Sequence, residues 1–405
     1  MKTLHLTNAY HATSGGVSTF YRALLKHANE HRRPMRLIVP AESSFTERVG
    51  ENGIIYHVRA EPSPIADQRY RLLYLWGDSG REVRDILRHE RPDLVETSDK
   101  YTLPLFSAFL RKGWIPGVPR PVLVATSHER MDDTAKAYFA MPPVWDVLSG
   151  LFMKQYYFPM FDWHIANSAY TAEELSPASK GHRLNREIRI LPMGVDADTL
   201  RPDSRSASAR CELAQMAGAP CESNLLLYVG RLATEKNLPL LVDMLERLSA
   251  QFSLVVAGDG LLSEWLAEQS VSRLQGRLRL IGHVARDRIA RLYAGADAFV
   301  HANPKEPFGI APLEAMAAGV PLIVPNSGGV LSYANDANSW LAEPDPDSFA
   351  KAVESVFADA GACREKISRA RQTAVEHNWP RVVARYFDLY DEIISRGDVW
   401  SSKAA

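Results

Sequence analysis

The feature that most constrains the fold is a repeated alternation of short apolar runs with longer amphipathic stretches along the 405 residues. Apolar runs bounded by turn residues are typical of buried strands, and their alternation with helical patterns favours parallel sheets covered by helices. After a strand-like opening, the first series of runs lies at 36–40, 94–98, 121–127, 163–168 and 188–196. The second series lies at 224–232, 252–260, 277–284, 298–303 and 321–329. We therefore predict an α/β chain with two doubly wound domains of similar size.

A polar stretch rich in small residues, 201–224, separates the two series. We interpret it as the linker and the entry to the second domain. In doubly wound sheets, ligands bind outside the carboxyl ends of the strands. Two such sheets facing each other predict a cleft between the domains.

The composition indicates which partners the protein can attract and in which cellular compartment it works. The formal net charge is −1, so no general attraction to nucleic acid is expected. Three cysteines form neither a disulfide framework nor a metal-ligand spacing, which favours a reducing compartment. The sequence shows no signal-peptide pattern and no apolar run long enough to cross a bilayer. We expect a cytoplasmic protein.

Two cations follow the first strand of the second series. In YVGRLATEKN, residues 228–237, the strand ends near Gly230, and Arg231 and Lys236 lie in the loop that follows. A planar guanidinium and an ammonium point charge at this place can bind a diphosphate. Two solvated surface cations are the alternative interpretation.

A second motif, residues 306–329, carries two carboxylates eight residues apart, Glu306 and Glu314. A PFG turn precedes a predicted helix that ends at Gly319. The backbone N–H groups of residues 309–311 lie at the start of this helix, a position that favours phosphate. Because carboxylates only accept hydrogen bonds, Glu306 can bind sugar hydroxyls and Glu314 the diol of a ribose. A helix surface charge is the alternative for Glu314.

Two further candidates belong to the first series. Gly15 and Gly16 precede an amphipathic run. A glycine lets the backbone approach a ligand closely, and the helix start favours phosphate, but a plain turn is the alternative. His128 follows the run 121–127 at the carboxyl edge of the predicted sheet, where binding residues gather. A buried core histidine is the alternative there.

Together these motifs resemble the retaining glycosyltransferases of family 4, the glycosyl transferases group 1 type, which have the GT-B architecture of two Rossmann-like domains. The matching segments occur in the family's order over nearly the whole chain. They are SGGV (14–17), TSHE (126–129), ANS (166–168), PMGVD (192–196), GRLATEKN (230–237), AGDG (257–260) and the E-x7-E run (306–314). The chain departs from the family at Met193, where asparagine is usual, so no polar contact is expected from that side chain.

The resemblance implies a role for each matching residue of the second domain. Glu314 would hold the ribose of the donor and Glu306 the donor sugar, while Arg231 and Lys236 would neutralise the diphosphate. The remaining expected donor-site residues are Gly258, Asp259, Val284, Phe308, Gly309, Ile310 and Ala311.

For the first domain, the resemblance implies His128 near the transferred sugar and Gly16 near the diphosphate or the acceptor. It also implies that the last helix returns to the first domain. The expected acceptor-side domain is then 1–197 plus 375–405, and the donor domain is 198–374.

The implied substrates are a UDP- or GDP-sugar and a hydroxyl acceptor, which is a glycan, a lipid-linked or a small-molecule acceptor. We expect no cofactor besides the donor and no metal, because two cations are available to the diphosphate and no Asp-x-Asp motif ends a strand.

Three alternatives stay open at this point. An inverting GT-B enzyme would use a histidine of the first loop, such as His11, as a general base. A nucleotide-sugar epimerase would need no acceptor, and a nucleotide-sugar sensor would bind the donor without turnover. The segment 141–163, rich in aromatic residues and methionine, is a core helix or a surface for an apolar acceptor; the second case predicts peripheral contact with the inner membrane face.

Overall fold

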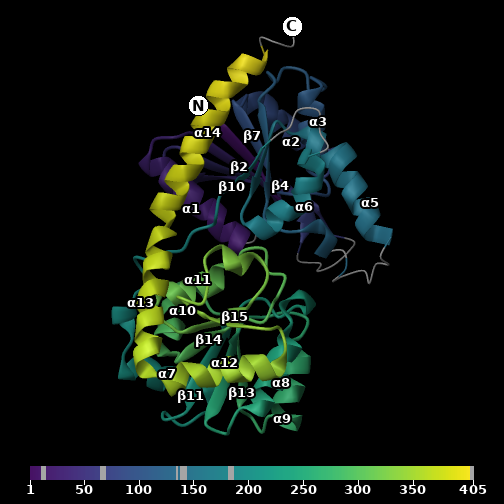
Figure 1. The fold of residues 1–405 in the computed structure, drawn as a ribbon. Coiled ribbons are helices and arrows are strands. Elements are labelled where there is room, and N and C mark those ends of the chain that lie inside the picture. The colour runs from purple at the N-terminus through teal and green to yellow at the C-terminus, as the bar shows by residue number, and fades with distance from the viewer. Residues whose placement is uncertain (11–14, 64–69, 134–135, 137–143, 181–186, 402–405) are drawn as a thin grey trace. The chain divides into compact units, whose positions relative to one another are not determined.

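The computed structural model describes residues 1–10, 15–63, 70–133, 136, 144–180 and 187–401. The chain divides into two compact units (Figure 1). Unit 1 comprises Met1–Pro192 and Val382–Ala405, and unit 2 comprises Met193–Arg381. The sequence prediction set the boundaries after residues 197 and 374. In unit 2 the backbone around Val195 is bonded to the chain at 377–379, through Val195 N to His377 O at 2.9 Å and Trp379 N to Val195 O at 3.1 Å.

Unit 1 is built on an eight-stranded sheet of order β10-β9-β8-β7-β1-β2-β4-β3. Its neighbouring strands are parallel, except that β3 is antiparallel to β4. The strands are β1 (Thr3–Leu6), β2 (Met35–Ala41), β3 (Phe45–Val49), β4 (Gly53–Arg59), β7 (Leu94–Thr97), β8 (Val122–Ser127), β9 (Trp163–Ala166) and β10 (Ile188–Ile190). Strands β3 and β4 were not predicted from the sequence, because β3 is exposed and neither strand is a continuous apolar run. A two-stranded ribbon, β5 (Glu61–Pro62) and β6 (Arg71–Leu72), lies outside the sheet.

The helices of unit 1 are α1 (Gly16–Glu30), α2 (Gly77–Glu90), α3 (Pro104–Arg111), α5 (Val144–Phe152), α6 (Ala169–Lys180) and the greater part of α14 (Trp379–Ser401). A π-helical turn, Met153–Tyr157, and a 3-10 turn, Phe158–Met160, follow α5. One broad face of α14 is apolar and buried. Its buried residues are Val382, Val383, Tyr386, Phe387, Leu389, Tyr390 and Ile393.

Unit 2 is built on a six-stranded parallel sheet of order β13-β12-β11-β14-β15-β16. The strands are β11 (Asn224–Val229), β12 (Phe252–Ala257), β13 (Leu278–Gly282), β14 (Ala298–Val300), β15 (Leu322–Pro325) and β16 (Trp340–Ala342). The helices are α7 (Ala207–Ala217), α8 (Leu238–Arg247), α9 (Ser263–Ser272), α10 (Arg286–Gly295), α11 (Ile310–Ala317), α12 (Pro346–Ala358) and α13 (Ala360–Glu376). Helix α8 packs on α12, and α7 packs on α10. The prediction of two doubly wound α/β domains is confirmed.

The interpretation of residues 201–224 as a linker needs correction, because this stretch contains helix α7. Ser206 caps the helix by accepting from Ala209 N at 3.2 Å, and Gly218 ends it in the left-handed region, with φ 59°. Residues spaced four apart, such as Leu213 and Ala217, are buried. Because most side chains of this stretch are small, its helical spacing of apolar residues is weak in the sequence. Helix α7 belongs to the layer of helices that covers the sheet of unit 2.

Candidate functional site

The topology of unit 2 gathers the predicted donor-site residues at one edge of its sheet. All six strands are parallel, so the loops that follow them emerge at the same edge. The loop after β11 carries Arg231 and Lys236, and the loop after β14 carries Glu306. Gly258 and Asp259 follow β12, and Val284 follows β13. Four separate sequence motifs therefore share one end of the sheet.

Lys236 and Glu306 form the centre of this edge. Lys236 Nζ donates to Glu306 Oε2 at 2.7 Å, and the two side chains are 18% and 11% exposed. The same carboxylate oxygen accepts from Asn303 Nδ2 at 3.1 Å and lies 3.3 Å from His301 Nε2. Burial alone would raise the pKa of Glu306, but Lys236 and His301 outweigh it and hold the pKa well below its usual range. Glu306 is therefore an ionised acceptor at neutral pH.

Arg231 is also paired with a carboxylate. Arg231 Nη2 donates to Glu235 Oε1 at 2.6 Å across the 3-10 turn Thr234–Lys236. Tyr228 at the end of β11 lies beside both ion pairs: its hydroxyl donates to Arg231 O at 3.2 Å. Burial first, and then the charges of Glu306 and Glu235, raise the pKa of Tyr228. The predicted cations are therefore held in ion pairs rather than exposed singly.

Glu235, His301 and Asn303 were not among the residues predicted from the sequence. Glu235 lies four residues after Arg231, a spacing that places two side chains on the same side of a turn. His301 and Asn303 follow directly on β14 at the carboxyl edge. Because binding residues gather at the carboxyl ends of parallel strands, the polar residues after this apolar run could have been predicted to belong to the site.

The expected residues Gly258 and Asp259 shape the loops. A Cβ at Gly258 would lie 1.8 Å from Gly230 O, so only glycine allows the loops after β11 and β12 to touch. The Asp259 carboxylate accepts from Gly260 N at 2.8 Å and from Ser263 Oγ at 3.2 Å. These contacts give both residues a local structural role. Val284 is partly buried in its loop.

Helix α11 begins at the predicted place. Gly309 precedes it with φ 85°, and Ile310 and Ala311 form its first turn. The Phe308 side chain is buried against Tyr333, with ring centroids 5.2 Å apart.

Glu314 lies in the second turn of α11 and is partly buried. Its Oε2 is bonded to the Tyr293 hydroxyl at 3.0 Å. Burial raises the pKa of Glu314, although Arg286 and Tyr293 act in the opposite direction. These contacts argue against the alternative of a solvated helix surface charge.

His128 lies directly after β8 in unit 1 and is 8% exposed. Its ring packs against Phe20 and Tyr21 of α1, at centroid distances of 5.1 and 6.3 Å. Within the described residues neither ring nitrogen has a hydrogen-bond partner. Burial lowers the pKa of His128 to about 4, with Glu96 opposing and Lys100 adding to this effect. A neutral imidazole with two unpaired nitrogens can both donate to and accept from a ligand.

Gly16 is the first residue of α1, and Gly15 precedes it with φ 100°. Among the described residues, a Cβ built at Gly15 would meet no atom within 4 Å, so the positive φ angle, and not crowding, favours glycine there. His11, the base required by the inverting alternative, lies outside the described residues.

A buried carboxylate lies close to His128, and the sequence analysis did not find it. Glu96 of β7 is fully buried; it accepts from the Tyr21 hydroxyl at 3.0 Å and from the hydroxyl of Tyr390. His5 Nδ1 lies 3.4 Å away. Burial would raise the pKa of Glu96, but His5, Tyr390 and His128 lower it below its ordinary value. Glu96 thus attaches helix α14 to the sheet of unit 1 as an ionised group.

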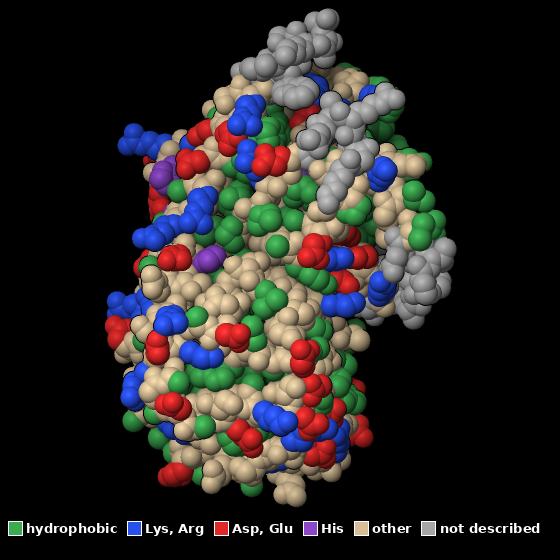
Figure 2. Space-filling model, in the orientation of Figure 1, with side chains coloured by type: hydrophobic (Ala, Val, Ile, Leu, Met, Phe, Trp, Pro, Cys, Tyr) green, Lys and Arg blue, Asp and Glu red, His purple; other side chains and the backbone are tan. Residues whose placement is uncertain are grey.

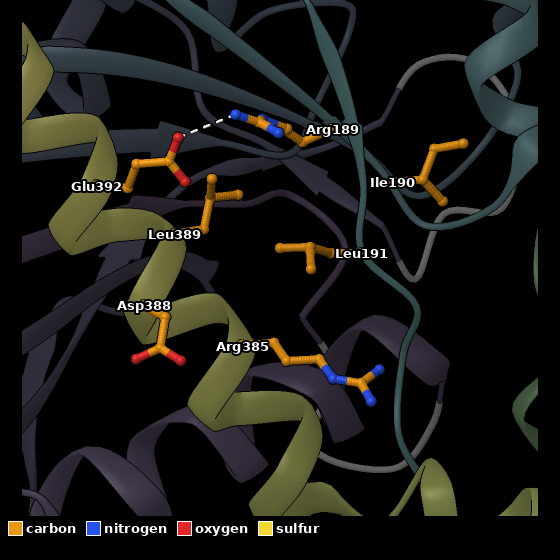
Figure 3. A pocket seen from close by; sticks show the side chains of 7 residues that line it. All are labelled: Arg189, Ile190, Leu191, Arg385, Asp388, Leu389 and Glu392. Atoms are coloured by element: carbon orange, nitrogen blue, oxygen red, sulfur yellow. Dashed lines mark hydrogen bonds and ion pairs between the residues drawn. The ribbon is translucent and has the colours of Figure 1, made fainter.

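A cavity of about 310 Å³ in unit 1 lies elsewhere, between β10 and α14 (Figure 3). Arg189 and Glu392 form an ion pair of 2.9 Å on one side of it, and Arg385 lines the opposite side. None of the predicted site residues lines this cavity.

Segment 141–163 is described from residue 144, and its two halves differ. Val147, Leu148 and Leu151 of α5 are 63%, 47% and 46% exposed, whereas Tyr157 and Phe158 are buried. Tyr157 and Phe158 fit the core interpretation, whereas the exposed side chains of α5, and Tyr156 at 59% exposure, fit an exposed apolar surface.

Three further observations concern the described part of the chain. No helix there has both the length and the apolar character needed to cross a membrane. His, Cys, Asp and Glu side chains form no group of three or more suited to a metal ion within the same residues. On the face shown in Figure 2, basic and acidic side chains are interspersed.

Two family models match the chain. The model described as Glycosyltransferase Family 4 matches residues 14–199, and the model described as Glycosyl transferases group 1 matches residues 212–373. The two matches lie in the two halves of the fold and together cover most of the sequence. The chain belongs to the family-4 glycosyltransferases, and its two α/β units have the GT-B fold.

Individual relatives agree with this assignment. A D-inositol 3-phosphate glycosyltransferase of Xylanimonas cellulosilytica is 32% identical over 57% of this chain, which spans 57% of that relative's length. A GDP-mannose-dependent alpha-(1-6)-phosphatidylinositol dimannoside mannosyltransferase of Mycobacterium tuberculosis is 26% identical over 95% of this chain and 94% of its own. Among solved structures, Anabaena HepE in complex with UDP superposes with a TM-score of 0.72 at 18% identity, over 97% of this chain and all of HepE.

Proposed function

We propose that this protein is a retaining hexosyltransferase that moves a sugar from a UDP- or GDP-sugar to a hydroxyl acceptor without a divalent metal. The observation that carries the proposal is the cluster of Lys236, Glu306 and Arg231 at the carboxyl edge of the unit 2 sheet, beside the start of α11. The names of relatives support it, since one is described as GDP-mannose-dependent and HepE was crystallised with UDP.

In this mechanism the leaving diphosphate gains negative charge as the bond to the sugar carbon breaks. Arg231, Lys236 and the backbone at the start of α11 stabilise that charge from fixed positions. Ionised Glu306 accepts hydrogen bonds from the sugar hydroxyls, and Glu314 binds the ribose diol. The ion pairs hold both cations in place at this edge of the sheet before a donor binds.

His128 has a different part in the proposal. As a neutral imidazole it donates through one nitrogen and accepts through the other, which suits a sugar hydroxyl better than a phosphate. We assign it to the transferred sugar, and we assign the backbone at Gly16 to the diphosphate or the acceptor.

For the acceptor, we propose a polyhydroxylated head group, free or linked to a lipid. Two relatives are described as acting on an inositol phosphate and on a phosphatidylinositol dimannoside. The exposed apolar side chains of α5 would suit peripheral contact with the inner face of the membrane.

A panel of nucleotide sugars tests the proposal. Thermal stabilisation of the protein and slow release of nucleoside diphosphate are measured for each UDP- and GDP-sugar, with and without EDTA. We expect one donor to stabilise the protein and to be hydrolysed in the absence of an acceptor. Conversion of a donor to its epimer without release of nucleoside diphosphate would favour the epimerase alternative, and stabilisation without any turnover would favour the sensor.

A further inference from the structure

We propose that Glu235 opposes the diphosphate at the donor site and so speeds the release of the nucleoside diphosphate product. The inference rests on the proposed function, because it takes Arg231 and Lys236 as the diphosphate-binding cations.

Each of the two cations already faces a carboxylate. Arg231 lies 2.6 Å from Glu235, with side chains 32% and 21% exposed, and Lys236 lies 2.7 Å from Glu306. The two pairs share one loop, because Arg231, Glu235 and Lys236 all lie in it, and the Tyr228 hydroxyl donates to Arg231 O at 3.2 Å. Among the described residues, each of these cations therefore has a carboxylate beside it before a donor binds.

The two carboxylates are held differently. Glu306 is fixed by Lys236, Asn303 and His301, and the proposed mechanism uses it for the sugar. Glu235 precedes Lys236 in the same 3-10 turn and bonds the outer end of the Arg231 guanidinium. A phosphate oxygen that approaches this guanidinium competes with Glu235 for its N–H groups and meets a like charge.

The repulsion is larger for the product than for the donor. In a nucleoside diphosphate sugar each phosphate carries one charge. When the sugar leaves, the bonding electrons stay on the terminal phosphate, which then has a second ionisation with a pKa near 6. At neutral pH the product therefore carries nearly one more negative charge beside Glu235. The carboxylate shifts the balance toward release, a step that limits turnover in many enzymes.

Glu235→Gln is the variant that tests this role, since the amide keeps the shape and removes the charge. Glu246→Gln is the matched control: Glu246 pairs with Arg273 at 2.6 Å on the surface of the same unit. Titration calorimetry with UDP and GDP, and with the corresponding nucleotide sugars, is done at pH 7.5 and low ionic strength. We expect Glu235→Gln to bind the nucleoside diphosphate at least about fivefold more tightly, because a unit charge about 4 Å away in a partly solvated site is worth that factor or more.

The nucleotide sugar should gain less affinity than the product, kcat should fall, and product inhibition should become stronger. The Glu246→Gln control should behave as the wild type. Raised salt should shrink the difference between the variants.

Unchanged or weaker binding of the product to Glu235→Gln would show that Glu235 orients Arg231 instead, and the inference would be wrong while the proposed function stands. Lys236→Ala separates the two claims. If the wild type binds neither UDP nor GDP, or if Lys236→Ala does not weaken binding, then both the proposed donor site and the role of Glu235 are wrong.

Discussion

Removing the Tyr390 hydroxyl should destabilise unit 1 more than removing the hydroxyl of its neighbour Tyr386 on the same helix. Tyr390 donates to the buried, ionised Glu96, whereas Tyr386 donates to the neutral Leu191 carbonyl at 3.0 Å. Both tyrosines are fully buried, so Tyr→Phe removes one oxygen and leaves the packing of the ring. The pair of variants therefore compares a charged acceptor with a neutral one on one helix.

The expected loss of stability depends on whether the acceptor of the hydroxyl is charged or neutral. A hydrogen bond to a charged group contributes about 1.5–3 kcal/mol, against about 0.5–1.5 kcal/mol for a neutral pair. We expect Tyr390→Phe to cost about 2 kcal/mol and Tyr386→Phe about 1 kcal/mol. For a unit of this size, 2 kcal/mol lowers Tm by about 4–8 °C.

Thermal unfolding followed by circular dichroism gives the difference in Tm, and hydrogen exchange of peptides from residues 382–396 locates it on α14. Equal destabilisation by the two substitutions would refute the reasoning, because it would mean that Glu96 carries no charge in the folded protein or does not hold the helix.

The remaining predictions concern the site. Glu306→Gln and Lys236→Ala should each lower the transfer rate by about 10²–10³ without unfolding the protein, measured by turnover and circular dichroism; near wild-type rates in both would remove the site assignment. Activity should persist in EDTA, because cationic side chains take the place of a metal, and loss of activity that manganese or magnesium restores would overturn this. His128→Ala should leave nucleoside diphosphate affinity within a few-fold and strongly reduce transfer; an affinity loss as steep as that of Lys236→Ala would place His128 with the phosphates. The low pKa of His128, about 4, predicts a loss of stability as pH falls from about 6.5 toward 4, since the unfolded chain takes up the proton first. Between pH 7.5 and 5 the wild type should lose about 2 kcal/mol more than His128→Phe in denaturant unfolding, and equal losses would contradict a buried neutral imidazole.

Much of this architecture could be predicted from the sequence because buried parallel strands are continuous apolar runs. The runs at 224–232 and 252–260 became β11 and β12, and the polar residues after them fell at one edge of the sheet. Strands β3 and β4 were not predicted because β3 is an exposed edge strand and the apolar residues of β4 do not form a continuous run. Helix α7 was not predicted because its buried residues are mostly small, so the helical spacing of apolar residues is weak among the polar ones.

The partners of the site residues were harder to predict than the residues themselves. The carboxylate partner of Lys236 lies 70 positions along the chain, and that of Tyr390 lies 294 positions away, so no local pattern joins them. Glu96 follows two apolar residues of β7, and its charge depends on two tyrosines and a histidine that only the fold brings together.

The central claim is that the edge built around Lys236 and Glu306 transfers a sugar with retention. Proton NMR of the reaction tests it most directly, because the coupling of the anomeric proton gives the configuration of the first product formed from the best nucleotide sugar. The account predicts release of nucleoside diphosphate, a product with the donor's anomeric configuration, and a rate at least about 100-fold lower in Glu306→Gln. An inverted product, or an unchanged rate in Glu306→Gln, would contradict it.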